Sequence, residues 1–213
     1  MLVIRYYARA LFVHRLLSSL SEAKRPKRIL AVLAGGTEEA VNESDLALSD
    51  PVNYGKILPC AAHSATFTSL AFEHLASLYP TTAFVHAYPG LVKTQALTNW
   101  ISNAWVKWLI DWTIVPLVTP FSVPLDEAGQ RALFYLTSKR YPPQKDDGKA
   151  LGVELPENLD KAGVQGKGGK YAVLRYGDLG DGKIMAEYRE RDFGKTVWEH
   201  SLKTFDDALK KSI

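Results

Sequence analysis

The sequence predicts an α/β fold, with a small parallel sheet between two helical layers (αβα) in a single domain of residues 1–213. Three short apolar runs at 28–34, 82–88 and 171–176 lead into turns that contain glycine, which is typical of buried strands. Helical patterns, with apolar side chains three and four residues apart, lie around these runs. Strands and helices that alternate in this way favour a parallel sheet covered on both faces.

The first half of the chain predicts two helices around the first strand. Apolar side chains recur at helical spacing over 5–20, and the strand at 28–34 follows. Residues 37–55 are polar and rich in Asn and Asp, which favours a loop. Residues 58–79 form a long apolar segment rich in small side chains, so a second helix is expected there.

The second half predicts three further helices and one long loop. Indole and aliphatic side chains at 100–112 form one stripe of an amphipathic helix. Asp126 is expected to cap another helix that ends near Ser138. Residues 139–170 are rich in Lys, Gly, Pro and Asp, which predicts a long surface loop, and a last helix is expected at 193–209.

Composition excludes several classes of function. The net charge of +3, from 26 basic and 23 acidic residues, gives no basic surface for nucleic acid. A single cysteine, Cys60, cannot form an intrachain disulfide and indicates a reducing compartment, the cytoplasm. The five histidines lack metal-ligand spacing, so no metal is expected. The most apolar stretch, from Trp100 to Pro124, contains charges and prolines that argue against a membrane span.

The segment from Tyr6 to Ser138 resembles the second half of a short-chain dehydrogenase/reductase, particularly the fungal members. The matching runs are Y-Y-A-R-A-L-F-V-H-R-L-L, R-I-L-A-V-L-A-G-G, H-S-A-T-F-T-S-L-A-F-E-H-L-A, V-H-A-Y-P-G-L-V-K-T and D-E-A-G-Q-R-A-L-F-Y-L. The P-G-x-V-x-T pattern at 89–94, one strand after a helix of small residues, is the most specific of them. The resemblance implies a partial, Rossmann-like sheet whose first strands are missing.

Departures from the family pattern fall on its catalytic and cofactor-binding positions. The family opens with a glycine-rich strand, turn and helix that hold the dinucleotide pyrophosphate, and only five residues precede Tyr6 here. The family's catalytic serine would fall near Ala34, and its supporting asparagine near Arg5. We therefore expect a truncated family member that binds no nicotinamide cofactor.

The family's Tyr-x-x-x-Lys pair is also absent in either alignment. Tyr54 is followed four residues later by Leu58, and the other register places Lys56 and Cys60 in the two positions. Tyr54 and Lys56 could persist as an acid or electrostatic pair, or they could be ordinary loop residues.

Two further residues are candidates for acid–base catalysis. His63 lies in the first turns of the small-residue helix, and an imidazole titrates near neutral pH. The alternative is a packed histidine that is hydrogen-bonded to a backbone carbonyl. Tyr88 precedes Pro89-Gly90, a position that faces the nicotinamide and substrate in the family, so its phenol could donate to a substrate carbonyl, or its role could be structural.

A dense group of tryptophans suggests the class of ligand. Residues 100–125 match the variable substrate lid of the family, and Trp105 and Trp108 would shape a pocket for a flat, apolar or aromatic substrate. Lys93 and Thr94, after the Pro-Gly turn, are expected to bind substrate as well, although Thr94 could instead only cap the next helix. The alternatives are a surface helix packed on the core and peripheral contact with a membrane.

Three functions follow from these observations. The first is a cofactor-independent, redox-neutral enzyme, an isomerase, cyclase or dehydratase, that acts on an apolar natural-product intermediate. The second is an NAD(P)-dependent reductase with a degraded cofactor site. The third is a non-catalytic partner that pairs with a full-length reductase. A homodimer is expected through the helices 5–20 and 58–79, covering the bare edge of the strand at 28–34.

Overall fold

Three parallel strands form the sheet of the computed structural model, in the order β1-β2-β3. They are β1 (Arg28–Val32), β2 (Ala83–Ala87) and β3 (Lys170–Val173). In register, Arg28 lies opposite Ala83, and Val85 lies opposite Tyr171. The structure describes residues 1–24, 26–52, 56–92, 103–145, 152–163, 165–166 and 168–210.

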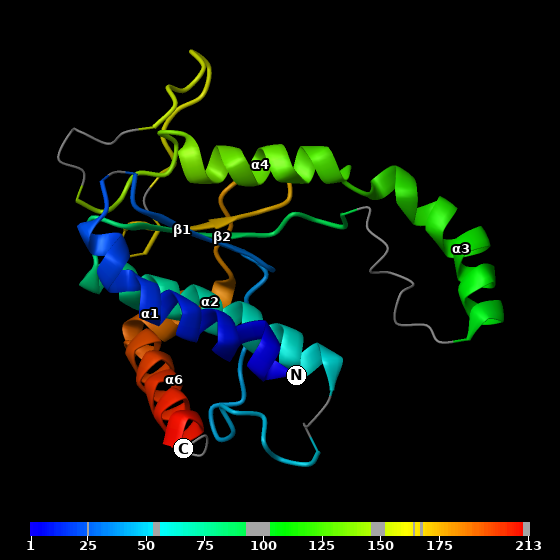
Figure 1. The fold of residues 1–213 in the computed structure, drawn as a ribbon, viewed down its shortest axis with the longest axis horizontal. Coiled ribbons are helices and arrows are strands. Elements are labelled where there is room, and N and C mark those ends of the chain that lie inside the picture. The colour runs from blue at the N-terminus through cyan, green and yellow to red at the C-terminus, as the bar shows by residue number, and fades with distance from the viewer. Residues whose placement is uncertain are drawn as a thin grey trace.

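Helices cover both faces of this sheet, which confirms the predicted α/β class (Figure 1). One face packs on α2, with α1 and α6 on the same side of the sheet and α6 packed along α2, and the other face packs on α4. The helical elements are η1 (Val3–Tyr7), α1 (Ala8–Glu22), α2 (Ile57–Leu78), α3 (Ala104–Val118), η3 (Thr119–Phe121), α4 (Leu125–Thr137), α5 (Lys183–Glu190) and α6 (Phe193–Lys210). No helix among these described residues is long and apolar enough to cross a bilayer.

The long helix α2 is the centre of the larger core. Its apolar and small side chains are buried between the sheet and α6, which packs along it. Ser64, Ala65 and Ser69, which lie on the helix expected to pair with a second copy, are therefore covered within the chain itself. The homodimer through α1 and α2 stays a prediction, but most side chains of α2 are already buried within the chain and cannot contact a second copy.

Several elements differ from the expected ones for local reasons. Helix α4 begins after Pro124, and Asp126 lies in its first turn, where a carboxylate favours the helix dipole, instead of at the cap. The segment 139–170, expected at the surface, contains the fully buried Tyr141. Helix α5 was not predicted, because eight residues after a glycine-rich turn give too short a pattern to recognise.

Helix α3 agrees with the prediction in position and differs in packing. It extends past the expected end at residue 112 and continues through Pro116. Figure 1 shows it reaching away from the sheet, and its main contact is with η3, which directly follows it. The indole stripe that was expected to pack against the core or cover a pocket is exposed here.

Candidate functional site

The carboxyl ends of the three strands form the edge of the sheet where ligands collect in parallel α/β folds. At this edge β1 leads into Gly35-Gly36, β2 into Tyr88-Pro89-Gly90, and β3 into the segment around Gly177. A methyl group on Gly35 would lie 1.9 Å from the carbonyl oxygen of His86. The first turn therefore needs glycine because it crosses directly over β2.

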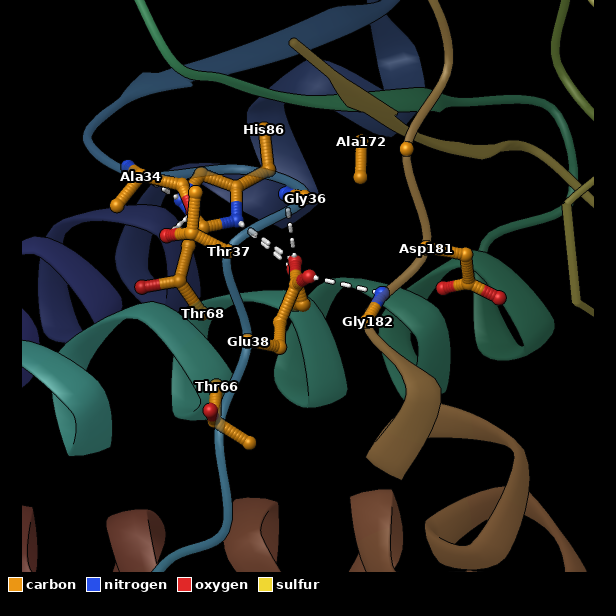
Figure 2. A network of polar contacts seen from close by, with 12 residues as sticks. Ala34, Gly36, Thr37, Glu38, Thr66, Thr68, His86, Ala172, Asp181 and Gly182 are labelled. Carbon is orange, nitrogen blue, oxygen red and sulfur yellow. Dashed lines mark hydrogen bonds and ion pairs between the residues drawn. The ribbon is translucent and has the colours of Figure 1, made fainter.

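A buried hydrogen-bond network ties these turns to α2 (Figure 2). The Ala34 amide donates to His86 Nε2 at 3.2 Å, which places the ring proton on Nδ1, where Ser69 Oγ lies 2.8 Å away. The Ser69 hydroxyl in turn donates to the carboxylate of Glu38. These hydrogen bonds therefore form one continuous chain. It runs from the turn after β1 to His86 on β2, then to Ser69 on α2, and back to Glu38 beside the same turn.

Glu38 is the acceptor on which this network converges. Its Oε1 also accepts from the Gly36 amide at 3.0 Å, and its Oε2 accepts from the Gly182 amide at 3.3 Å. Gly182 is the N-cap of α5, so the carboxylate lies at the positive end of that helix. One buried acidic side chain thereby joins the segments that follow β1 and β3 (Figure 2).

A buried lysine and two further carboxylates lie close to this network. The Lys170 side chain is fully buried, and its Nζ lies 3.8 Å from Asp181 Oδ1 without a hydrogen-bond partner among the described residues. Burial lowers the pKa of Lys170, and the carboxylates of Glu38, Asp181 and Glu73 act in the opposite direction. Burial, assisted by nearby cations, lowers the pKa of His86 to about 3, so its ring is neutral at physiological pH.

This arrangement holds structure together and does not reach a substrate. In a hydrolase triad the histidine lies between the serine and the carboxylate and activates an accessible hydroxyl. Here Ser69 lies between His86 and Glu38, and the side chains of Ser69 and His86 are fully buried. Sequence reasoning missed Glu38 and Ser69, because a lone Glu in a polar loop and a Ser among small residues give no spacing signal.

His63 has the packed environment that was the alternative to its catalytic role. The Asn42 amide donates to its Nε2 at 3.0 Å, and its Nδ1 lies 3.1 Å from the Pro59 carbonyl oxygen. Burial lowers the pKa of His63. Both ring nitrogens are therefore engaged with the backbone, where they fix the loop after Glu38 to the start of α2.

The other predicted site residues are not gathered into one pocket. Tyr88 is half-buried directly after β2, and its amide donates to the Val173 carbonyl at 2.8 Å. Lys56 is exposed at the N-cap of α2. Trp105 and Trp108 lie on the projecting α3 and contact each other edge to face, with their ring centroids 5.4 Å apart. Their exposed fractions are 74% and 54%. The remaining three, Tyr54, Lys93 and Thr94, lie outside the described residues.

A nicotinamide dinucleotide, which the resemblance implies, needs backbone amides that cradle its pyrophosphate. Among the described residues, the glycine turns after β1 and β3 carry amides of this kind, at Gly36 and Gly182. The Glu38 carboxylate accepts from both, so a second anion would meet like charge there. The described residues do not fit the pyrophosphate at this place, and we assign no hydride transfer to them.

Fold and site together define an α/β protein with a partial, Rossmann-like parallel sheet. No family model matches the chain, and no solved structure matches it.

The chain is similar to fungal proteins named as oxidoreductases. It is 39% identical over 211 residues to Oxidoreductase AN1596 of Emericella nidulans, covering 98% of this chain and 62% of the relative. Identity to Oxidoreductase andH of Emericella variicolor is 34%, covering 96% and 60%. Identity to Short-chain dehydrogenase/reductase SAT2 of Stachybotrys chartarum is 27%, covering 97% and 58%. The chain thus spans about three-fifths of the length of these relatives.

Proposed function

We propose that the chain functions as an oxidoreductase of the short-chain dehydrogenase/reductase class, and that its carboxyl edge binds an apolar small molecule. The observation that carries the proposal is the 39% identity, over nearly the whole chain, to a relative named as an oxidoreductase. A second relative bears the class name itself. The parallel order of β1, β2 and β3 and the Pro-Gly turn after β2 support the same assignment.

Within this proposal, Tyr88 is the residue that contacts the substrate. Its backbone is fixed between β2 and β3, and its side chain is half-buried at the carboxyl edge. A phenol in this position can donate a hydrogen bond to a carbonyl or hydroxyl oxygen and polarise it. Trp105 and Trp108 offer apolar rings for a flat substrate, and Lys93 and Thr94 remain proposed contacts.

Three other sequence-based candidates have less support. His63 would have to break a backbone hydrogen bond before it could accept a proton, so we leave it out of the proposal. Lys56 is exposed and distant in sequence from the Pro-Gly turn, and Tyr54 is outside the described residues.

A redox-neutral reaction is a second candidate, favoured by one observation. The Glu38 carboxylate already accepts from the amides of Gly36 and Gly182, so these two amides are not free to cradle a cofactor. An isomerisation or dehydration needs only a shaped pocket and an acid–base group such as the Tyr88 phenol.

Titration of the protein with NADPH, followed by indole fluorescence, tests the two candidates. Saturable quenching, together with NADPH consumption in the presence of a panel of apolar ketones, supports the oxidoreductase. Conversion of a compound in the same panel without NADPH supports the redox-neutral enzyme. Tyr88→Phe should reduce either turnover at least tenfold, whereas the exposed Tyr176→Phe should leave it unchanged. If neither NADPH nor the panel produces a response, both candidates are wrong.

A further inference from the structure

The chain leaves the sheet before α3 and returns to it after η3 at the same place. The Val123 amide donates to the Leu91 carbonyl at 2.7 Å, and Val123 pairs with Val92 in a parallel β-bridge. We call residues 91–92 and 119–123 the base of α3. None of the described side chains of α3 belongs to the core, and the main contact of this helix is with η3. The position of α3 therefore depends on the few groups that hold its base.

Arg175, two residues after β3, is one of these groups. Its Nη2 donates to the carbonyl oxygen of Phe121, the last residue of η3. The last carbonyl groups of a helical segment lack partners within the segment and carry partial negative charge, so a guanidinium caps them favourably. This bond therefore joins the end of the helical segment to the carboxyl end of β3.

The stem of Arg175 also contacts the turn after β2. Gly90 has a φ of +74°, and a methyl group on it would lie 2.7 Å from Arg175 Cδ and 2.8 Å from Cγ. Arg175 Nε is buried and has no hydrogen-bond partner among the described residues. The turn therefore fits closely against this arginine, and Tyr88 lies two residues before Gly90.

The backbone of Arg175 is held from the other side by α4. Arg131 Nη1 donates to the Arg175 carbonyl, and its Nη2 pairs with Glu127 one turn earlier on the same helix. Arg175 is thus fixed at its backbone, while its side chain contacts both the turn after β2 and the base of α3. Figure 1 shows α3 on the side of the sheet toward which β2 runs, which is the side of this turn.

We propose that Arg175 is a positioning residue of the carboxyl edge, which sets the place of the α3 indoles relative to Tyr88. The inference rests on the proposed function for what these groups bind, whereas the contacts of Arg175 are independent of it. Its Nη2 is engaged and its Nε is buried, so Arg175 acts through Phe121 and Gly90 and does not touch substrate. A helix with few core contacts moves readily when an attachment is lost, and a displaced wall binds substrate less well.

Spin labels measure this positioning without any substrate. In a Cys60→Ala background, labels at Thr113→Cys on α3 and Lys203→Cys on α6, which are both exposed, report the distance from α3 to the core by double electron–electron resonance. Arg175→Met removes the donor to Phe121 and should broaden the distance distribution by about twofold or more. Arg175→Lys keeps the stem and one donor, so its distribution should be narrower than that of Arg175→Met.

Arg140→Met is the matched control. Arg140 Nη1 donates to the Asp160 carbonyl at 2.7 Å, and its guanidinium lies 5.9 Å from the Tyr141 ring centroid, much as Arg175 lies 5.2 Å from that of Tyr176. These contacts do not involve the base of α3, so the distribution should stay as in wild type. The Phe121 bond is exposed, so Arg175→Met should still fold. An unchanged distribution in Arg175→Met, or equal broadening in both variants, would overturn the proposal.

Steady-state kinetics separate positioning from a general loss of structure. For a compound that wild type converts, Arg175→Met should raise KM about fivefold or more and leave kcat within about twofold. The reason is that methionine keeps a stem beside Gly90, so the Tyr88 phenol stays in place while the apolar wall moves. A lower kcat at unchanged KM would contradict a role through α3. If wild type converts no compound, the proposed function is wrong, and the distance distributions still decide the role of Arg175.

Discussion

At the scale of single residues, the carboxyl edge depends on a few side chains that are hidden from solvent. Glu38 accepts from two backbone amides and one hydroxyl, and His86 links the turn after β1 to α2 through Ser69. Buried polar groups are stabilising only when they are fully paired, so a change at one of them should affect the others.

His86 should make the stability of the protein depend on acid. Its folded pKa of about 3 lies below the ordinary 6.5, so the unfolded chain takes up the proton first as the pH falls. The contribution is complete above pH 6.5 and is lost between 6.5 and 3, on the order of 5 kcal/mol in all. We expect the free energy of unfolding, measured in urea at several pH values across this range, to change less with pH for His86→Asn than for wild type.

Gly35 should tolerate no side chain. Gly35→Ala places a methyl group against the His86 carbonyl, so the turn must move away from β2, and we expect a loss of more than about 2 kcal/mol. Gly129→Ala is the matched control, because it lies in α4 with nothing near its Cβ and should gain up to about 1 kcal/mol. Similar urea midpoints for the two variants would contradict this account of the turn.

At the scale of elements, the sequence predicts those helices and strands whose positions follow from the spacing of apolar residues. Helices α1, α2 and α6 and all three strands lie where apolar spacing placed them, within a few residues. Helix α5 and the network around Glu38 could not be predicted, because they depend on contacts between residues more than a hundred positions apart. His63 matched a catalytic pattern in sequence, although its ring packs between backbone groups of Asn42 and Pro59, which residue spacing alone does not reveal.

Helix α5 should depend on one arginine. Arg189 Nε donates to the buried Glu73 on α2 at 2.7 Å, and its Nη2 donates to Asp181 at 2.8 Å. Arg189→Met would leave the Glu73 carboxylate buried and unpaired, and we expect the free energy of unfolding to fall by roughly 2–4 kcal/mol. The second ion pair, with Asp181, adds little because Asp181 is partly exposed. Arg191→Met removes exposed ion pairs with Glu43 and Glu187 and the contact of the guanidinium with the rings of Tyr188 and Phe193, but it leaves no buried charge unpaired. Its urea midpoint should fall much less than that of Arg189→Met, and an equal loss in both variants would refute the assignment.

At the scale of the whole molecule, the first and last described helical elements, η1 and α6, are held together. Tyr6 Oη lies 2.8 Å from Ser201 Oγ, and Tyr7 Oη lies 2.7 Å from His200 Nε2. These contacts join η1 to α6 over the surface of α2, so the larger core includes both ends of the described chain. A core that depends on contacts so distant in sequence should unfold in one cooperative step, whereas α3, which lies outside it, should not take part.

Tryptophan placement allows this difference to be measured. Trp198 is buried in the core, whereas Trp105, Trp108 and Trp112 are exposed on α3. With Trp100→Phe in both, one variant keeps only Trp198 and the other keeps only the α3 indoles. Emission from Trp198 should follow the loss of circular dichroism in urea, because both report the core. Emission from the α3 indoles should already resemble that of solvated tryptophan and change gradually. Blue-shifted α3 emission with a coincident, sharp transition would instead mean that α3 is packed against the protein or a second copy in solution.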